Sequence, residues 1–313
     1  MSLLSLLDVP APAKLNLFLH VVGRRADGYH LLQSVFVLID WCDVLHFERR
    51  SDGRLQRHDL GPALPADDLS LRAARALQQA SGTALGADLS VDKRLPWGAG
   101  LGGGSSDAAS TLLALNRLWG LHWPREKLLP IALTLGADVP FFVGGRNAFV
   151  EGIGERLSPL PAQALPPQCF AVLKPAASIA TGSIFGSPLL VRDTEAVIVI
   201  SFLADAQLQA RLEAGYGRND LQPAAEAICP EVTQVAAWLA KRFGNSRMSG
   251  SGSAVFARVG QEFEGRLGNS HLGTGDQPGA TDRAGSLATV MPSGWVGRMC
   301  RSLVQHPLLG WAD

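Results

Sequence analysis

The sequence predicts an α+β protein of two domains, and three observations support this prediction. The chain has 313 residues, more than one hydrophobic core usually organises. In the first half, runs of alternating apolar and polar residues precede runs with helical spacing. A proline-rich stretch from Pro159 to Pro167 is then typical of a linker. We therefore expect a first domain at residues 1–160 and a second at residues 161–313.

The composition narrows the classes of protein to consider. The formal net charge is zero, which gives no indication of nucleic acid or acidic membranes as partners. Four cysteines lie far apart without a Cys-x-x-Cys pair, which favours reduced thiols over a disulfide or zinc framework. The apolar segment Leu3–Leu7 has no basic residue before it and is followed by Asp8, unlike a signal peptide. These features together predict a cytoplasmic protein.

The first predicted strand runs from Ala13 to Val22. Its aliphatic residues alternate with polar ones, so Lys14 and Asn16 project together from the face opposite the leucines. Two explanations remain open for these polar side chains. They belong to a functional site, or the strand is simply an exposed edge of its sheet.

A turn follows this strand at Asp27-Gly28, and further strands are expected at 35–39 and 44–48. Tyr29 and His30 come directly after the turn, where side chains are available to a ligand. An exposed Tyr-His pair at a hairpin is common, so the pair alone does not indicate a site.

The next segments combine a helix with a strand. A helical stripe over residues 69–80 has Asp67 or Asp68 as a candidate N-cap and Gly82 near its end. An alternating strand over residues 88–95 then includes Lys93 and leads into a glycine-rich stretch.

The glycine-rich stretch predicts a site for an anion such as phosphate. It begins at Pro96 and ends in Ser-Ser-Asp at Asp107, and a helix is predicted at 108–119. Glycines allow positive φ and close approach of a ligand, while the amides and dipole of a helix N-terminus attract negative charge.

Three other interpretations of this stretch are weaker. A Walker A loop requires lysine after its last glycine, where this chain has Gly104. Gly98, Gly100 and Gly103 match the dinucleotide fingerprint, but the preceding strand alternates and no acid stands about 20 residues on, as the ribose contact requires. A flexible linker would not normally end in good capping residues followed by an amphipathic helix.

Asp138 follows a predicted helix at 124–136 and is a candidate site residue. Asp138 precedes a stiff Val-Pro step and two phenylalanines, which places it on rigid, apolar backbone. Helix capping is the alternative role for this side chain. The remaining predicted elements are a hairpin at 147–157, a strand at 170–173, a loop or helix start at 181–185, a helix at 232–243, a loop at 247–253, a strand at 254–259 and a mobile excursion at 260–290.

Three motifs together resemble a superfamily of small-molecule kinases that includes galactokinase, homoserine kinase and mevalonate kinase. They are the strand with Lys14, the stretch from Pro96 to Asp107 together with Leu-Gly-Ala-Asp-Val-Pro-Phe-Phe around Asp138, and Met-Ser-Gly-Ser-Gly-Ser from Met248. The sequence is most similar to the branch that acts on 4-diphosphocytidyl-2-C-methyl-D-erythritol. Supporting segments are Ala13–Leu17, Arg24–His30, Asn219–Leu221, Gly294-Trp295 and His306–Leu308, so the resemblance spans almost the whole chain.

The resemblance implies an S5-like N-terminal domain and a ferredoxin-like C-terminal domain with the active site between them. It also implies an ATP-dependent enzyme that uses Mg²⁺ and phosphorylates the 2-hydroxyl of this cytidylated methylerythritol, in the non-mevalonate route to isoprenoid precursors. Such an enzyme would bind a small-molecule substrate as a monomer or weak homodimer. A mevalonate- or homoserine-type kinase and a non-catalytic nucleotide-binding protein are the alternatives.

The resemblance also assigns roles to residues. Asp138 would be the general base and Lys14 its partner. The phosphates and nucleotide of ATP would contact Lys93, Pro96, Trp97, Gly98, Ala99, Gly100, Leu101, Gly102, Gly103, Gly104, Ser105 and Ser106. For the two serines, contact with magnesium or phosphate and helix capping are both open. The magnesium ligands stay unassigned, and the branch often has Asn-Leu on the adenine side where this chain has Asp68-Leu69.

The acceptor substrate would contact Asn16, Tyr29, His30, Thr181 and Phe185. Cytosine is flat, so Tyr29 and Phe185 would stack on it while His30 hydrogen-bonds to its edge.

Overall fold

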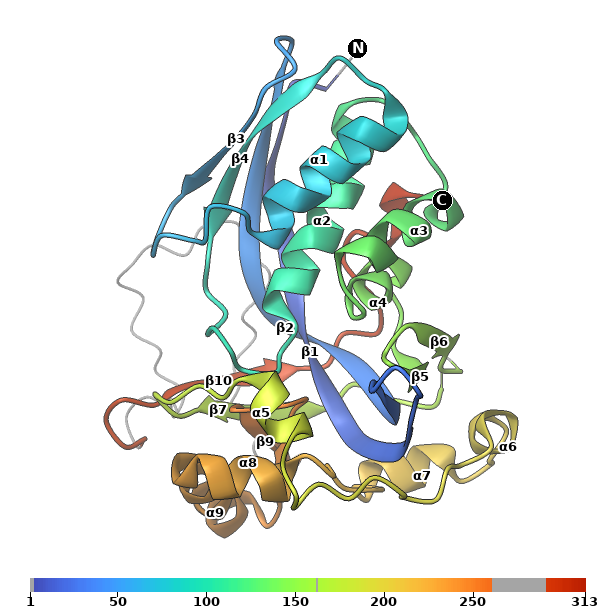
Figure 1. Ribbon diagram of the computed structural model, residues 1–313, viewed down its shortest axis with the longest axis vertical. Helices are drawn as coiled ribbons and strands as arrows, with labels where there is room; N and C mark the ends of the chain where they lie inside the picture. The colour runs from blue at the N-terminus through green and yellow to red at the C-terminus, as the bar shows by residue number, and fades with distance from the viewer. Residues whose placement is uncertain (1–2, 162, 261–290) are drawn as a thin grey trace.

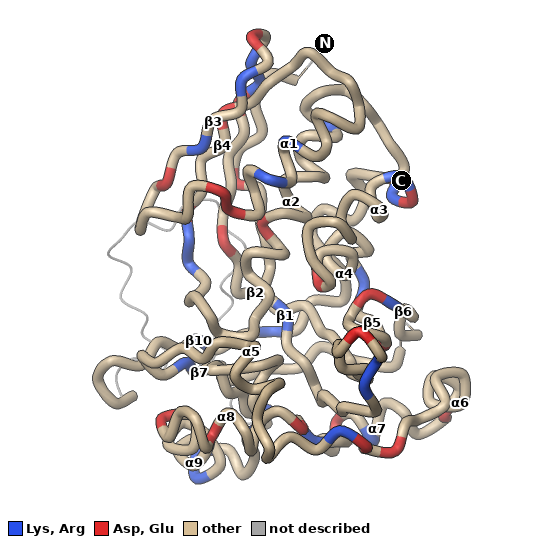
Figure 2. Tube along the Cα trace, viewed as in Figure 1, with Lys and Arg blue, Asp and Glu red and all other residues tan. Residues whose placement is uncertain are grey.

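The computed structural model describes residues 3–161, 163–260 and 291–313, which form two units that each combine a β-sheet with helices (Figure 1). The strands of each sheet are mostly antiparallel and the helices are segregated from them, so the predicted α+β class is confirmed. Apart from Gly260, the expected excursion at 260–290 lies outside the described residues. Acidic and basic residues are interspersed along the trace of both units (Figure 2).

The first unit is organised around a long antiparallel hairpin. Its strands are β1 (Ser5–Arg24) and β2 (His30–Arg50), joined by the predicted turn, where Gly28 has a φ of 92°. On its other edge, β2 pairs with β5 over its first part and with β4 over its last part. The remaining strands complete the order β3-β4-β2-β5-β6, with bounds β3 (Leu55–Asp59), β4 (Gly86–Asp92), β5 (Ala148–Gly152) and β6 (Arg156–Pro159).

The prediction of separate strands at 35–39 and 44–48 is wrong, because both belong to β2. The register against β1 shifts between the pairs Ala13–Ile39 and Pro12–Cys42, so β2 contains extra residues at this point. This irregularity lets one strand change its second partner, and it interrupts the alternation that would have marked a continuous strand.

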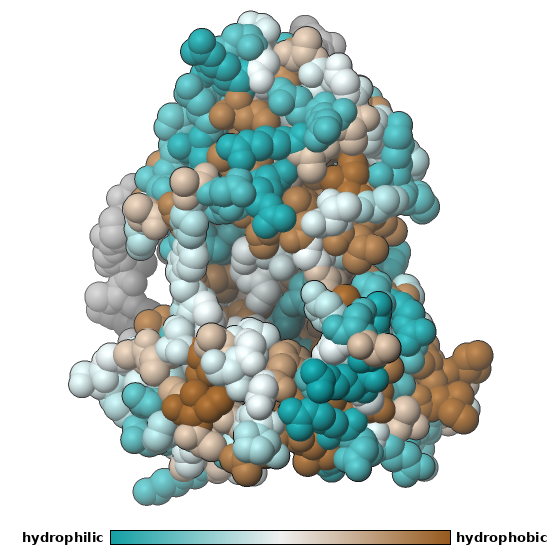
Figure 3. Space-filling model, in the orientation of Figure 1, coloured by the Kyte–Doolittle hydropathy of each residue, from teal (hydrophilic) through white to brown (hydrophobic). Residues whose placement is uncertain are grey.

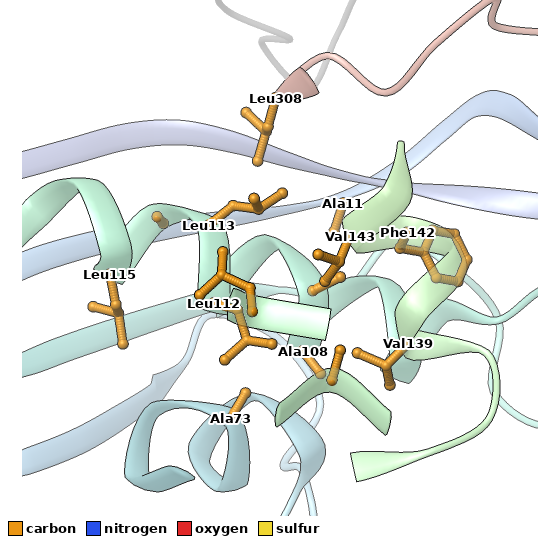
Figure 4. Close-up of a cluster of buried hydrophobic side chains, with 14 of the residues drawn as sticks. Ala11, Ala73, Ala108, Leu112, Leu113, Leu115, Val139, Phe142, Val143 and Leu308 are labelled. Carbon is orange, nitrogen blue, oxygen red and sulfur yellow. The ribbon is translucent and has the colours of Figure 1, made fainter. Parts of the chain in front are cut away.

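Four helices cover one face of the first sheet: α1 (Leu69–Ser81), α2 (Gly103–Leu118), α3 (Arg125–Leu135) and α4 (Val139–Gly144). Helix α2 lies at the centre of this layer. Its leucines pack against α4 and against Ala73 of α1, as Figure 4 shows. Asp68 caps α1 by accepting hydrogen bonds from the backbone of Ser70 and Leu71, and Gly82 ends it with a φ of 66°. Both features agree with the sequence-based expectation.

The second unit has an antiparallel sheet of order β10-β7-β9-β8, the arrangement of a ferredoxin-like domain. Its strands are β7 (Cys169–Lys174), β8 (Arg247–Met248), β9 (Val255–Val259) and β10 (Val296–Arg301). Helices α8 (Gln222–Ile228) and α9 (Pro230–Phe243) contribute to its core. Shorter helices are α5 (Thr181–Phe185), α6 (Val199–Leu203) and α7 (Leu208–Glu213).

An apolar cluster joins the two units. Leu15, Leu17 and Val37 of the hairpin belong to the same buried cluster as Phe170 and Phe256 of the second sheet. This shared core packs the hairpin of the first unit directly against the sheet of the second.

The last residues of the chain return to the first unit. The backbone N–H of Leu303 donates to the carbonyl of Leu38 at 2.8 Å, and Leu308 and Ala312 are buried in the same cluster as α2. Figure 4 shows Leu308 above Leu113. The 3₁₀ turn Leu309–Trp311 lies in this segment.

Candidate active site

Two adjoining cavities lie between the units, where the surface in Figure 3 is hollowed. Cavity A has a volume of about 750 Å³ and cavity B about 600 Å³. Both are lined by Gly100, Gly102 and Thr181, so they meet at these residues. The two cavities can therefore hold two ligands end to end.

The structure gathers nearly all of the predicted site residues around these cavities. Cavity A is lined by Lys14, Asn16, Tyr29, His30, Asp138, Thr181 and Phe185, the predicted catalytic pair and acceptor contacts. Cavity B is lined by Lys93 and by Pro96, Trp97, Gly98, Ala99, Gly100, Leu101, Gly102, Gly103, Gly104 and Ser105, the predicted nucleotide contacts. Ser106 is fully buried and lines neither cavity.

The glycines of the loop allow it to cross a second loop closely. Gly98, Gly100 and Gly102 have φ values of 59°, 71° and 74°, which side chains rarely adopt. A Cβ atom on Gly100 would lie 2.2 Å from the carbonyl oxygen of Ser249. Only glycine fits at this crossing. The loop Ser249–Ser253 therefore packs directly against the glycine loop.

Backbone hydrogen bonds fasten the two loops together. The N–H groups of Ser253 and Ala254 donate to the carbonyls of Gly98 and Ala99, at 3.2 and 3.1 Å. The hydroxyl of Ser249 also donates to the carbonyl of Gly100 at 3.2 Å. The second unit thereby holds the loop that lines cavity B.

Helix α2 begins at Gly103, five residues earlier than predicted, with Gly102 as its N-cap. Ser105 and Ser106 therefore lie inside the first turns, so helix capping, one of the two roles left open for them, is wrong. The left-handed conformation of Gly102 ends the loop without any side-chain cap. Ser105 still faces cavity B from the first turn of the helix.

Lys14 and Asn16 are buried, at 3% and 1% exposure, so the explanation by an exposed edge strand is wrong. The free edge of β1 is covered by the glycine loop, since the N–H of Lys14 donates to the carbonyl of Leu101 at 2.9 Å. From the second unit, the hydroxyl of Ser249 accepts the N–H of Asn16 at 3.2 Å. The covering elements leave these two polar side chains facing cavity A.

The ammonium of Lys14 is surrounded by polar and aromatic groups. Its Nζ donates to Oδ1 of Asn16 at 2.6 Å and lies 3.6 Å from Oδ2 of Asp138. It also lies 4.6 Å from the centre of the Phe36 ring. Burial lowers the pKa of Lys14, and the attraction of Asp138 opposes this shift. Lys14 and Asp138 form an ion pair at the wall of cavity A.

The backbone at the start of α4 fixes the position of Asp138, while its side chain makes no hydrogen bond to the helix. The residue occupies the N-cap position of α4, but its carboxylate makes no capping hydrogen bond. The capping interpretation is therefore wrong for the side chain. Pro140 in the first turn stiffens the segment, and the carboxylate stays 31% exposed to the cavity. It can accept a proton from a ligand bound there.

Lys93 lies just beyond the end of β4 and forms a buried ionic cluster with two residues that sequence reasoning did not select. Its Nζ donates to Asp43, and to Oδ2 of Asp107 at 2.6 Å. Asp43 also accepts the backbone N–H groups of Arg94 and Leu95 at 2.6 and 2.7 Å. Burial raises the pKa of Asp107 to about 8 against the attraction of Lys93, and Asp43 adds to the rise. The cluster therefore holds the backbone of Arg94 and Leu95, directly before the glycine-rich stretch.

The far end of cavity A is aromatic. The rings of His30 and Phe185 are stacked with centres 4.9 Å apart, and the Tyr29 side chain beside them is exposed. The hydroxyl of Thr181 lies 2.9 Å from that of Ser251, near the junction of the cavities. These residues come from the β1–β2 hairpin, helix α5 and the second loop, so only the folded chain brings them together.

Among the described residues, His, Cys, Asp and Glu form no group of three that could hold a metal ion. In the same part of the chain, no helix combines the length and apolar character needed to span a bilayer.

Comparison with known proteins agrees with this geometry. Residues 68–146 match the family model described as GHMP kinases N terminal domain, and residues 200–265 match GHMP kinases C terminal. The chain is 62% identical over 312 residues to the 4-diphosphocytidyl-2-C-methyl-D-erythritol kinase of Methylibium petroleiphilum, with all of both chains covered.

Two solved structures are similar to this chain. A crystal structure of 4-(cytidine 5'-diphospho)-2C-methyl-D-erythritol kinase is 38% identical with a TM-score of 0.67, covering 80% of this chain and 89% of that one. Homoserine kinase from Cytophaga hutchinsonii is 17% identical with a TM-score of 0.64, covering 96% of this chain and 95% of that one, and shares the fold.

Proposed function

This chain belongs to the family of 4-diphosphocytidyl-2-C-methyl-D-erythritol kinases, and from this membership we propose a role for each cavity. The protein is an ATP-dependent small-molecule kinase of the non-mevalonate route to isoprenoid precursors. Its reaction transfers the γ-phosphoryl group of ATP to the 2-hydroxyl of the methylerythritol unit. Cavity B binds ATP, and cavity A binds the cytidylated acceptor.

One observation carries this proposal: the two cavities meet at Gly100, Gly102 and Thr181, beside the Lys14–Asp138 pair. A Cβ atom on Gly102 would lie 3.2 Å from Cγ of Lys14, so the junction touches the lysine side chain. A phosphoryl donor in cavity B and an alcohol in cavity A would therefore react next to a cation and a carboxylate. Phosphoryl transfer depends mainly on such positioning and on charge stabilisation.

In this reaction Asp138 accepts the proton of the attacking hydroxyl. Nζ of Lys14 lies 3.6 Å from Oδ2 of Asp138, so the ion pair holds the carboxylate beside the reacting hydroxyl. Its ammonium also neutralises negative charge on the transferring phosphoryl group. Asn16 orients Lys14 by accepting a hydrogen bond from Nζ, while its own Nδ2 donates to the hydroxyl of Ser34 at 3.0 Å.

Cavity B suits the phosphates of ATP. The amides at the N-terminus of α2 and the flexible glycine backbone bind anions well. We also propose that Mg²⁺ accompanies ATP. The donor set fits an ion bound mainly by ATP oxygens, because Ser105 lines cavity B and Mg²⁺ rarely requires a cage of protein ligands. The ion would neutralise charge on the β- and γ-phosphates.

In cavity A, cytosine stacks between Tyr29 and Phe185, and His30 hydrogen-bonds to its edge. Thr181 and Asn16 contact the part of the substrate nearer the junction. We further propose domains at 1–160 and 161–313, since the two sheets lie on either side of this boundary. We also propose that the protein is cytoplasmic, that it is a monomer or weak homodimer, and that it has no nucleic-acid partners.

The decisive experiment offers the purified protein ATP, Mg²⁺ and a panel of alcohols. Formation of ADP and of a singly phosphorylated product is expected with 4-diphosphocytidyl-2-C-methyl-D-erythritol, and not with mevalonate or homoserine. Turnover of either of those alcohols instead would assign the protein to the other kinase types. Binding of ATP without turnover of any alcohol would refute the proposal.

A further inference from the structure

Arg192 joins the two walls of the aromatic end of cavity A. Its Nε donates to Nε2 of His30 at 3.1 Å. Its terminal nitrogens donate to the carbonyls of Phe185, Ser187 and Leu190, each at 3.0 Å. One guanidinium therefore connects the start of β2 with the end of α5 and the segment that follows it.

This contact determines which nitrogen of His30 carries the proton. A guanidinium has only N–H donors, so Nε2 of the histidine has to be the acceptor. Burial, together with the positive charges of Arg192 and Arg24, lowers the pKa of His30, which keeps the ring neutral at pH 7. A neutral imidazole carries one proton, which is therefore on Nδ1. No hydrogen-bond partner for Nδ1 occurs within the described part of the chain.

The segment with Arg192 is itself anchored. Two residues on, the N–H of Thr194 donates to the carbonyl of Val21 at 3.1 Å, and its hydroxyl donates to Oδ2 of Asp220 at 2.6 Å. These bonds attach the segment to β1 and to the second unit. The guanidinium is thus held on both sides while it contacts the His30–Phe185 stack.

We propose that Arg192 is a positioning residue for base recognition, which fixes His30 as the Nδ1–H tautomer and holds its ring against Phe185. The aromatic end of cavity A then presents a donor to an acceptor on the pyrimidine edge. The identity of that base rests on the proposed function. Cytosine has an acceptor at N3, whereas uracil has an N–H there, so a fixed donor favours cytosine and leaves uracil with a clash of two donors.

The tautomer can be measured without any substrate. Nitrogen-15 NMR of protein labelled at histidine should show His30 protonated at Nδ1 and unprotonated at Nε2. In Arg192→Met this single state should be lost, because Nε2 is no longer bound. Arg24→Met is the matched control, since it removes a nearby positive charge but leaves the donor to Nε2, and it should keep the parent tautomer. A parent ring protonated at Nε2, or an unchanged ring in Arg192→Met, would overturn the proposal.

Binding tests the consequence for the base. Cytidine 5'-diphosphate should bind the wild-type protein (the parent) more tightly than uridine 5'-diphosphate does. Arg192→Met should lose about tenfold in cytidine diphosphate affinity, the usual effect of one hydrogen bond to a charged or buried group, with ATP affinity nearly unchanged. The preference over uridine diphosphate should fall towards one. Arg192→Lys keeps one donor and should recover part of the loss, which also covers the case in which the methionine variant fails to fold.

An equal loss of ATP and cytidine diphosphate affinity in both variants would show a merely structural role and contradict the proposal, as would a parent that binds the two pyrimidine diphosphates equally. Failure of the proposed function is a separate result. It would appear as a parent that does not phosphorylate the cytidylated alcohol, while the tautomer of His30 would still be decided by NMR.

Discussion

The carbonyl oxygen of Ser249 lies 2.2 Å from the position that a Cβ atom on Gly100 would occupy. Gly100→Ala would therefore force the two crossing loops apart and also strain a backbone with a φ of 71°. We expect a loss of about 1–3 kcal/mol in the free energy of unfolding and a higher KM for ATP. Urea unfolding and steady-state kinetics measure the two effects.

Gly104 in the same stretch provides the control for stability. A Cβ there would meet only Leu69 Cδ1 at an ordinary 3.5 Å, and the residue is helical. Gly104→Ala should leave the free energy of unfolding unchanged or raise it by up to about 1 kcal/mol. Equal destabilisation by both substitutions would argue against the loop crossing as the cause.

Replacing the proposed base is the direct test of the chemistry. Asp138→Asn keeps the size of the side chain but removes its ability to take a proton, so kcat should fall by about 10²- to 10⁴-fold. The carboxylate makes no capping bond, so the fold should be preserved. ATP affinity, measured by calorimetry, should be nearly unchanged. A large loss of ATP affinity would instead indicate that Asp138 maintains the structure of the junction.

Tyr29 allows base stacking to be separated from stability, because its side chain is 60% exposed. Tyr29→Ala should change the free energy of unfolding by no more than about 0.5 kcal/mol. Loss of one stacked ring costs about 1–3 kcal/mol, so KM for the cytidylated substrate should rise about 5- to 150-fold. KM for ATP should change much less. Similar increases in both KM values would contradict the stacking assignment.

Trp97 should report on the nucleotide cavity. Its side chain lines cavity B and is 51% exposed, so a bound nucleotide would change its surroundings. Titration with ATP should change the intrinsic tryptophan fluorescence of the parent, and most of this change should be absent in Trp97→Phe. The same signal in both proteins would show that the change arises from another of the seven tryptophans.

His306 makes stability depend on pH. Burial, with a smaller effect from Arg125, lowers the pKa of this ring to about 3, whereas an unfolded histidine titrates near 6.5. Between these values the unfolded chain binds more protons, so its contribution to stability is complete above about pH 6.5 and is lost as the pH falls towards 3. Urea unfolding across this range should show a shallower decline for His306→Gln. Parallel curves for the two proteins would exclude this histidine as the cause.

Much of the site was predictable because its chemistry is local in the sequence. The glycine stretch, the Tyr29-His30 turn and the acid before Val-Pro each form a short motif, and all of them line the two cavities. The prediction was weaker where long-range contacts decide the structure. The start of α2 depends on the conformation of Gly102, and the length of β2 depends on its change of partner.

The sequence did not indicate the roles of Asp107, Asp43 and Arg192 in holding other site residues. Asp107 closes the glycine motif, which was a usable signal, but Asp43 is an isolated acid in a strand, 50 residues before Lys93. Arg192 lies in a segment without regular structure, 162 residues from His30. Nothing in the local pattern of either residue indicates its partner. Such pairings come from the tertiary fold, which one sequence read in short windows does not contain.

The return of residues 303–312 to the first unit also concerns the order in which the protein is made. Leu308 and Ala312 complete a core whose other members, such as Leu113, leave the ribosome far earlier. Throughout synthesis of the second unit, this face of α2 is therefore uncovered. The core of the first unit is therefore completed only when residues 303–312 have been synthesised, after the whole second unit.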